Sequence, residues 1–149
     1  MITMNEILKG RAKLEELPKD VQANLQDLLI KINKLRTAYG KPLKVNDGYR
    51  RPQDRPKHGA LKSNHLIGCA IDLDDDDTAF LWTWVKANLQ LMKEIGLYIE
   101  DPRYTHGKVG TWMHFQTKPP ASGKRIFVPS SEPPSLPSLW DGKYDKKFD

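Results

Sequence analysis

Two segments of this 149-residue chain carry residue types that bind metals and activate water. His65 and Asp72 lie in the segment SNHLIGCAID (63–72), and His114 lies in TWMHFQT (111–117). Two histidines and one carboxylate form a common catalytic zinc set, because three protein ligands leave the fourth position open for water. Zinc lowers the pKa of that water towards about 7. His65 and Asp72 alone would be weak evidence, so the prediction of a zinc site depends on all three residues.

The residues around Asp72 leave space for an ion and a substrate. Gly68 permits a tight bend between His65 and Asp72. On a strand, where side chains alternate between faces, Gly68, Ala70 and Asp72 would share one face. The other face would then point into the core with Cys69, Ile71 and Leu73. We interpret Cys69 as a small buried hydrophobic residue.

The second segment alternates in the same way. His114 would share a strand face with Trp112 and Gln116, while Met113 and Phe115 point to the opposite face. A single histidine on a strand is usually structural, so His114 is informative only together with His65 and Asp72.

The clearest predicted helix covers residues 19–39, where apolar side chains recur every three or four positions and Gly40 and Pro42 follow. These are Val21, Leu25, Leu28, Leu29, Ile32 and Leu35. A second helix is predicted over residues 78–95, capped by Asp76 or Asp77 and ended by Gly96.

Short strands are predicted at 43–50, 68–73, 97–99, 111–117 and 126–128, with loops at 51–62 and 101–110. The fold class is therefore α+β: a single domain with a small antiparallel sheet that carries the zinc site and packs against helices. We assign residues 1–128 to this domain and residues 129–149 to a Pro/Ser-rich C-terminal tail.

Composition excludes several classes of protein. One cysteine cannot form an intramolecular disulfide or a multi-cysteine zinc site. No apolar run is long enough to span a membrane, and the N-terminus does not resemble a signal peptide, so we expect synthesis in a cytoplasm. The net charge of +5 favours anionic partners, but the basic residues are scattered. A nucleic-acid-binding module, whose affinity would fall steeply with salt, is therefore a minor alternative.

Residues 63–72 match the pattern S-x-H-x-x-G-x-A-x-D at every fixed position, and in this the chain resembles the D-alanyl-D-alanine metallopeptidase family. That family includes wall-lytic carboxypeptidases, vancomycin-resistance dipeptidases and phage endolysin peptidases, and the hedgehog signalling domain is similar in fold and zinc site. The segments DGYR (47–50) and WMH (112–114) match two further family motifs in the expected order. The resemblance covers roughly residues 20–128 and is greatest to short phage-borne members.

The resemblance implies roles for single residues. His65, Asp72 and His114 would ligate Zn²⁺. Arg50 would stabilise the oxyanion or hold a substrate carboxylate, which suits a guanidinium fork, and Ser63 could orient the substrate or a neighbouring group.

The catalytic base does not follow the family pattern. The usual acidic position is Thr111, and the alternative histidine position is Trp112. Glu100 is our preferred base, with Asp101 and His106 as alternatives.

The resemblance predicts a hydrolase: a zinc metallopeptidase, either endopeptidase or carboxypeptidase, that acts on peptidoglycan stem peptides of the cell wall. We expect a monomer with no nucleic-acid or membrane partner, acting in host lysis or as part of a virion. The main alternative is a catalytically inactive zinc-containing domain that binds wall or has a structural role in a virion.

Overall fold

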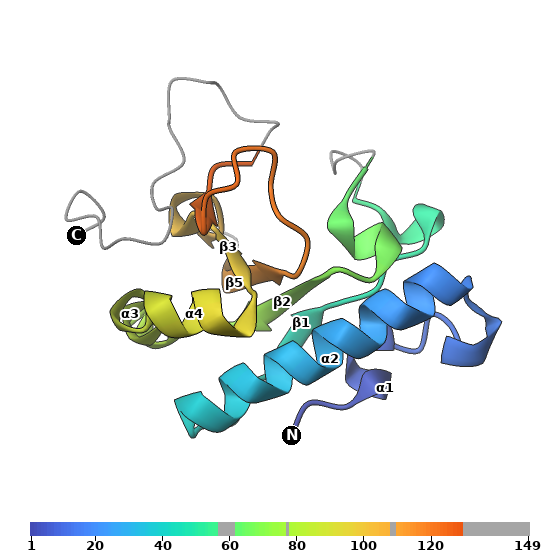
Figure 1. Cartoon of the computed structure of the whole chain (residues 1–149), viewed down its shortest axis with the longest axis horizontal. Coiled ribbons are helices and arrows are strands. Elements are labelled where there is room, and N and C mark those ends of the chain that lie inside the picture. Colours follow the sequence, from blue (N-terminus) through green and yellow to red (C-terminus); the bar gives the residue numbers. More distant parts are fainter. Residues whose placement is uncertain (57–61, 77, 108–109, 130–149) are drawn as a thin grey trace.

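The computed structural model describes residues 1–56, 62–76, 78–107 and 110–129, and it shows an α+β domain built on one sheet (Figure 1). The strand order is β1 (Val45–Asp47), β2 (Ala70–Asp74), β5 (Gly110–Gln116), β3 (Tyr98–Glu100) and β6 (Ile126–Phe127), and β4 (His106–Gly107) pairs with β5. The predicted α+β class is confirmed. The predicted tail lies almost wholly outside the described residues.

The sheet is mixed, although we predicted an antiparallel one. Strands β1, β2, β5 and β3 pair antiparallel, whereas β3 and β6 pair parallel. The reason is topological: the chain reverses direction once after β5, so that β6 runs in the same direction as β3 when it joins the edge of the sheet.

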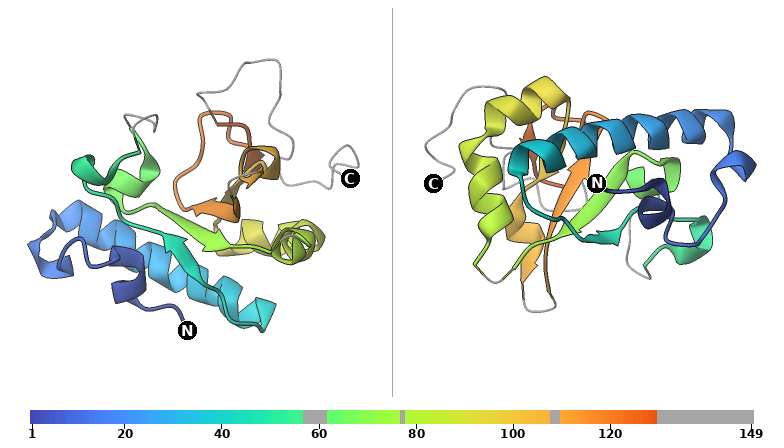
Figure 2. Two further views of the ribbon diagram at one scale, coloured as in Figure 1. Left: turned by 180° about the vertical axis from the view of Figure 1, so that it is seen from behind. Right: turned by 90° about the horizontal axis from the view of Figure 1, so that it is seen from below.

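The predicted first helix is confirmed as α2 (Lys19–Tyr39), and Gly40 ends it in a left-handed conformation. Its buried face contains Val21, Leu25, Leu28, Ile32 and Leu35. Together with the short α1 (Met4–Leu8), α2 lies along one side of the sheet (Figures 1 and 2). No helix among the described residues is both long and apolar enough to cross a membrane.

The predicted second helix is in fact two, α3 (Phe80–Ala87) and α4 (Leu89–Ile95), with a break at Asn88. The Asn88 side chain donates to the carbonyl of Trp84 at 2.7 Å, a local hydrogen bond of the kind that competes with helix continuation. Asp75, which we did not predict as a cap, accepts from the backbone N–H groups of Leu81 and Trp82.

The predicted caps were Asp76 and Asp77. Asp76 accepts from the backbone of Thr78 and Phe80, so it contributes to the same helix start. Asp77 lies outside the described residues.

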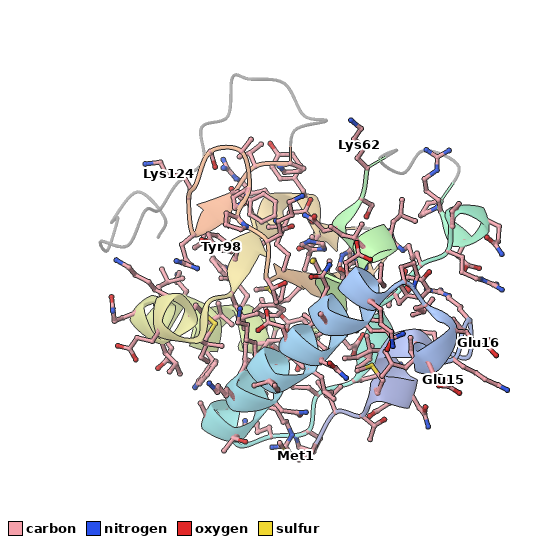
Figure 3. The ribbon with its side chains drawn as sticks, turned by 45° about the vertical axis from the view of Figure 1, so that its right-hand side comes forward. Met1, Glu15, Glu16, Lys62, Tyr98 and Lys124 are labelled. Atoms are coloured by element: carbon pink, nitrogen blue, oxygen red, sulfur yellow. The ribbon has the colours of Figure 1, made fainter. Side chains whose placement is uncertain are left out.

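Strand β5 separates the core from the site. Met113 and Phe115 are fully buried in the core that α2 covers, which leaves His114 and Gln116 on the opposite face. On that side stand the short 3₁₀ helix Asn64–Ile67 and the 117–125 loop (Figure 1). In Figure 3, Lys62, just before this 3₁₀ helix, and Lys124, in this loop, both lie in the upper part of the molecule.

Candidate metal centre

His65, Asp72 and His114 converge on one point. Each offers one ligand atom, and these atoms lie within 4.8 Å of one another. Asp72 on β2 is directly opposite His114 on β5, and Oδ1 of Asp72 is 2.9 Å from Nδ1 of His114 and 3.4 Å from Nε2 of His65. Ligands of a tetrahedral zinc ion are separated by about 3.4 Å, given metal–ligand distances near 2.1 Å. The three side chains therefore fit a single zinc ion.

The segment before β2 positions His65 by its backbone. The hydroxyl of Ser63 accepts from the backbone N–H of His65 at 3.2 Å, and Gly68 ends the 3₁₀ helix with φ of 76°. A Cβ on Gly68 would lie 2.7 Å from Cγ of Leu25 in α2. The predicted bend at Gly68 is thus confirmed. Its predicted place on the strand face of Asp72 is wrong, because β2 begins at Ala70.

Each histidine makes a hydrogen bond that orients its ring, so that the other ring nitrogen faces the point where the three side chains converge. Nδ1 of His65 donates to the carbonyl of Gly48 at 2.7 Å, which leaves Nε2 free to ligate. Nε2 of His114 donates to Oε1 of Gln116 at 3.0 Å, which leaves Nδ1 directed at Asp72. Such partners orient ligand histidines and make them more basic. We did not predict either partner as a site residue, although Gly48 lies in the DGYR segment and Gln116 on the His114 face.

The charges of the three candidate ligands strongly influence one another's pKa values. Burial alone would raise the pKa of Asp72, but hydrogen bonds from His114 and His65 outweigh it and hold that pKa well below its usual value. Burial opposes the charged form of His114, yet the hydrogen bond and charge of Asp72 raise its pKa to about 9. A cation at this point, whether a proton or a metal ion, is therefore stabilised by the residues around it.

Arg50 lies beside the ligands, as the resemblance implied. Its guanidinium NH2 nitrogen is 3.5 Å from Oδ2 of Asp72, and its backbone N–H donates to the carbonyl of His65 at 3.1 Å. Asp47 holds the guanidinium by a 2.6 Å bond to Nε, and Arg11 in turn holds Asp47 at 2.6 Å. Neither Asp47 nor Arg11 was predicted to have a role at the site.

Glu100, the preferred base, lies at the end of β3 next to β5. The register pairs Tyr98 with Gln116 and Ile99 with Phe115. Continued by one residue, it sets Glu100 opposite His114 and therefore on the same face. The negative charge of Glu100 is also one of the causes that raise the pKa of His114.

The two alternative bases differ from Glu100. Asp101 is buried, and its carboxylate accepts from both the backbone and the guanidinium Nε of Arg103. Those bonds favour a structural role for Asp101. The backbone of His106 pairs with that of Thr111 in β4 and β5, and the side chain of His106 lies outside the described residues.

The sheet of this α+β domain brings two histidines and a carboxylate to one point, with an arginine beside them, and this cluster could hold a metal ion. A comparison with known families matches residues 2–106, 105 of the chain's 149 residues, to peptidase M15, and the chain belongs to this family. The predicted family resemblance is confirmed. His114 lies beyond the matched segment, and the register of β5 with β2 is what joins it to His65 and Asp72. No curated protein matched the chain, and neither did any solved structure.

Proposed function

We propose that this chain is a zinc-dependent peptidase that hydrolyses amide bonds in the stem peptides of peptidoglycan. As a member of the M15 family the chain is a metallopeptidase, and the members of this family are zinc enzymes. The observation that carries the proposal is the convergence of His65, Asp72 and His114, in which each histidine also hydrogen-bonds an oxygen through the ring nitrogen that does not face Asp72.

Different residues of the chain would have different roles in amide hydrolysis. Bound zinc would be held by the two histidines and Asp72, and would supply a Lewis acid for the carbonyl together with water of lowered pKa. Arg50 is held in place by Asp47, with its NH2 nitrogen beside the ligand Asp72, where a fixed guanidinium can bind an oxyanion or a substrate carboxylate.

Glu100 is the proposed carrier of the proton that passes from water to the leaving amine. Its support is the strand register, which sets it on the His114 face without occupying a ligand position. A general base must lie within hydrogen-bond reach of the reacting water without coordinating the metal. A carboxylate beside the three candidate ligands suits this role.

The decisive assay measures amine release from purified peptidoglycan together with metal content. Wild type should bind about one zinc and release amines, and His65→Ala should lose both. Glu100→Gln should keep the zinc and lose activity by two orders of magnitude or more. Glu94→Gln, the same change at an exposed position on α4, is the matched control and should behave as wild type.

Each failure has its own meaning. Full activity in Glu100→Gln would move the base to another residue and leave the peptidase intact. A zinc-loaded wild type that releases no amine from any wall type would favour the inactive wall-binding or virion domain. A wild type that binds no zinc would refute the proposal.

A further inference from the structure

The outer face of α2 has a groove that the described part of the chain leaves exposed. Met1 and Ile30, which are 72% and 58% exposed, both line this groove of about 420 Å³. Its other lining residues are Asn33, Lys34, Thr37 and Ala38. Two exposed apolar side chains that line one groove are more informative than scattered single ones, because adjoining apolar surface marks sites of interaction.

The exposed side chains of α2 form a stripe that is centred on Ile30. Ala23, Ile30 and Thr37 are exposed and recur every seven positions, which is almost two helical turns, so they lie in line along the helix. Met1 lies beside this stripe (Figure 3), where Oγ1 of Thr37 donates to its Sδ at 3.9 Å. A large apolar residue between two smaller ones gives a surface of the kind that packs against a second helix.

Two opposite charges lie on the same edge of this stripe. Asp27 precedes Ile30 by three positions and Lys34 follows it by four, and both are exposed. If a second copy lies antiparallel about a two-fold axis at Ile30, Asp27 of each copy comes level with Lys34 of the other. In a parallel pair each charge would instead come level with its own counterpart. The charge pattern of α2 is therefore complementary to itself in the antiparallel direction.

We propose that this face of α2 is a self-association surface, through which two copies of the chain form an antiparallel dimer about a two-fold axis near Ile30. The groove beside Met1 would receive side chains of the partner helix, and the two pairs of Asp27 with Lys34 would fix the direction of packing.

This inference goes beyond the proposed function and does not depend on it. The dimer would replace the monomer that we expected from the sequence. The metal centres would stay accessible, because α2 covers the face of the sheet opposite to His114 (Figures 1 and 2).

Sedimentation velocity of the full chain at increasing concentration tests the dimer. One helix face is at the low end of interface areas, so we expect a dissociation constant of about 10–100 µM. Ile30→Glu should raise this constant more than tenfold, because two carboxylates would then face each other at the two-fold axis. The variant should still fold, since position 30 is exposed and a glutamate four residues before Lys34 favours the helix.

The antiparallel direction is tested by reversing the charges. Asp27→Lys and Lys34→Glu should each weaken association about tenfold, because two attractive pairs become two repulsive ones. An equimolar mixture of the two variants should associate as wild type does, since both pairs in the mixed dimer again join opposite charges. Lys93→Glu, the same change as Lys34→Glu at an exposed position on α4, is the matched control and should dimerise as wild type.

Three results would overturn the inference. The first is a wild type that stays monomeric over the whole concentration range. The second is a dimer that Ile30→Glu leaves intact, because the contact would then lie elsewhere. The third is a mixture of Asp27→Lys and Lys34→Glu that associates no better than either variant alone. None of these results bears on amine release from peptidoglycan, which tests the proposed function separately.

Discussion

The hydrogen bond from His114 to Gln116 should set the zinc affinity of the site. Gln116 is 3% exposed, so water cannot easily replace its side chain when Gln116→Leu removes the 3.0 Å bond to Nε2. The substitution also removes the donor to the Lys118 carbonyl at 2.7 Å. Loss of a partner that orients a ligand histidine lowers metal affinity roughly 10- to 100-fold, which corresponds to about 1.4–2.8 kcal/mol.

The assay is a competition titration against a zinc chelator of known affinity, with thermal unfolding of the metal-free protein in parallel. Gln116→Glu keeps an acceptor for Nε2–H and should bind zinc at least as tightly as wild type. Gln22→Leu removes a comparable 2.8 Å bond, to the carbonyl of Leu17 and away from the site, and should not change zinc affinity. A folded Gln116→Leu protein with wild-type zinc affinity would refute the assignment of Gln116.

Three further perturbations test how the fold supports the site. Gly48→Ala would place a Cβ 2.2 Å from the carbonyl oxygen of Ile7, which is backbone, so we expect a loss of about 1–3 kcal/mol in chemical denaturation and weaker zinc binding. In the metal-free protein the pKa of His114 is raised from 6.5 to about 9, so the stability it contributes is fully present below pH 6.5 and is lost as the pH rises through 9. The melting temperature should therefore fall over that range, and Asp72→Asn should flatten the fall; a wild-type curve equally flat would contradict the coupling. Leu25→Ala should cost roughly 2–5 kcal/mol, because Leu25 is fully buried beneath the bend that precedes β2, and a loss under 1 kcal/mol would show that the bend is supported otherwise.

The three candidate ligands were predicted mainly from the family motifs that they match, and local rules predicted how their segments are arranged. Alternation along β5 decided that His114 faces away from Met113 and Phe115, and the structure has that arrangement. The bend at Gly68 could be predicted because few residues other than glycine adopt a left-handed φ. These are properties of short segments, and short segments are where sequence patterns are most informative.

The supporting residues could not be predicted, because they depend on contacts between distant segments. Gly48 accepts the hydrogen bond from His65 through its backbone carbonyl, which every residue type has. The residue type at position 48 therefore does not predict this bond. The break at Asn88 arises from one side-chain bond inside an otherwise regular apolar pattern. The mixed edge of the sheet follows from where the chain turns after β5, which strand patterns do not specify.

The N-terminal segment shows why the site needs more of the chain than its motifs suggest. The motif resemblance begins near residue 20, yet the family match begins at residue 2. The structure supplies a reason: Arg11 bonds both the Asp47 carboxylate, at 2.6 Å, and the carbonyl of Tyr49, at 2.7 Å. Asp47 in turn orients Arg50 beside Asp72. An arginine that binds an oxyanion must be fixed before the substrate arrives, so the residues before α2 would help to prepare Arg50 for its proposed role.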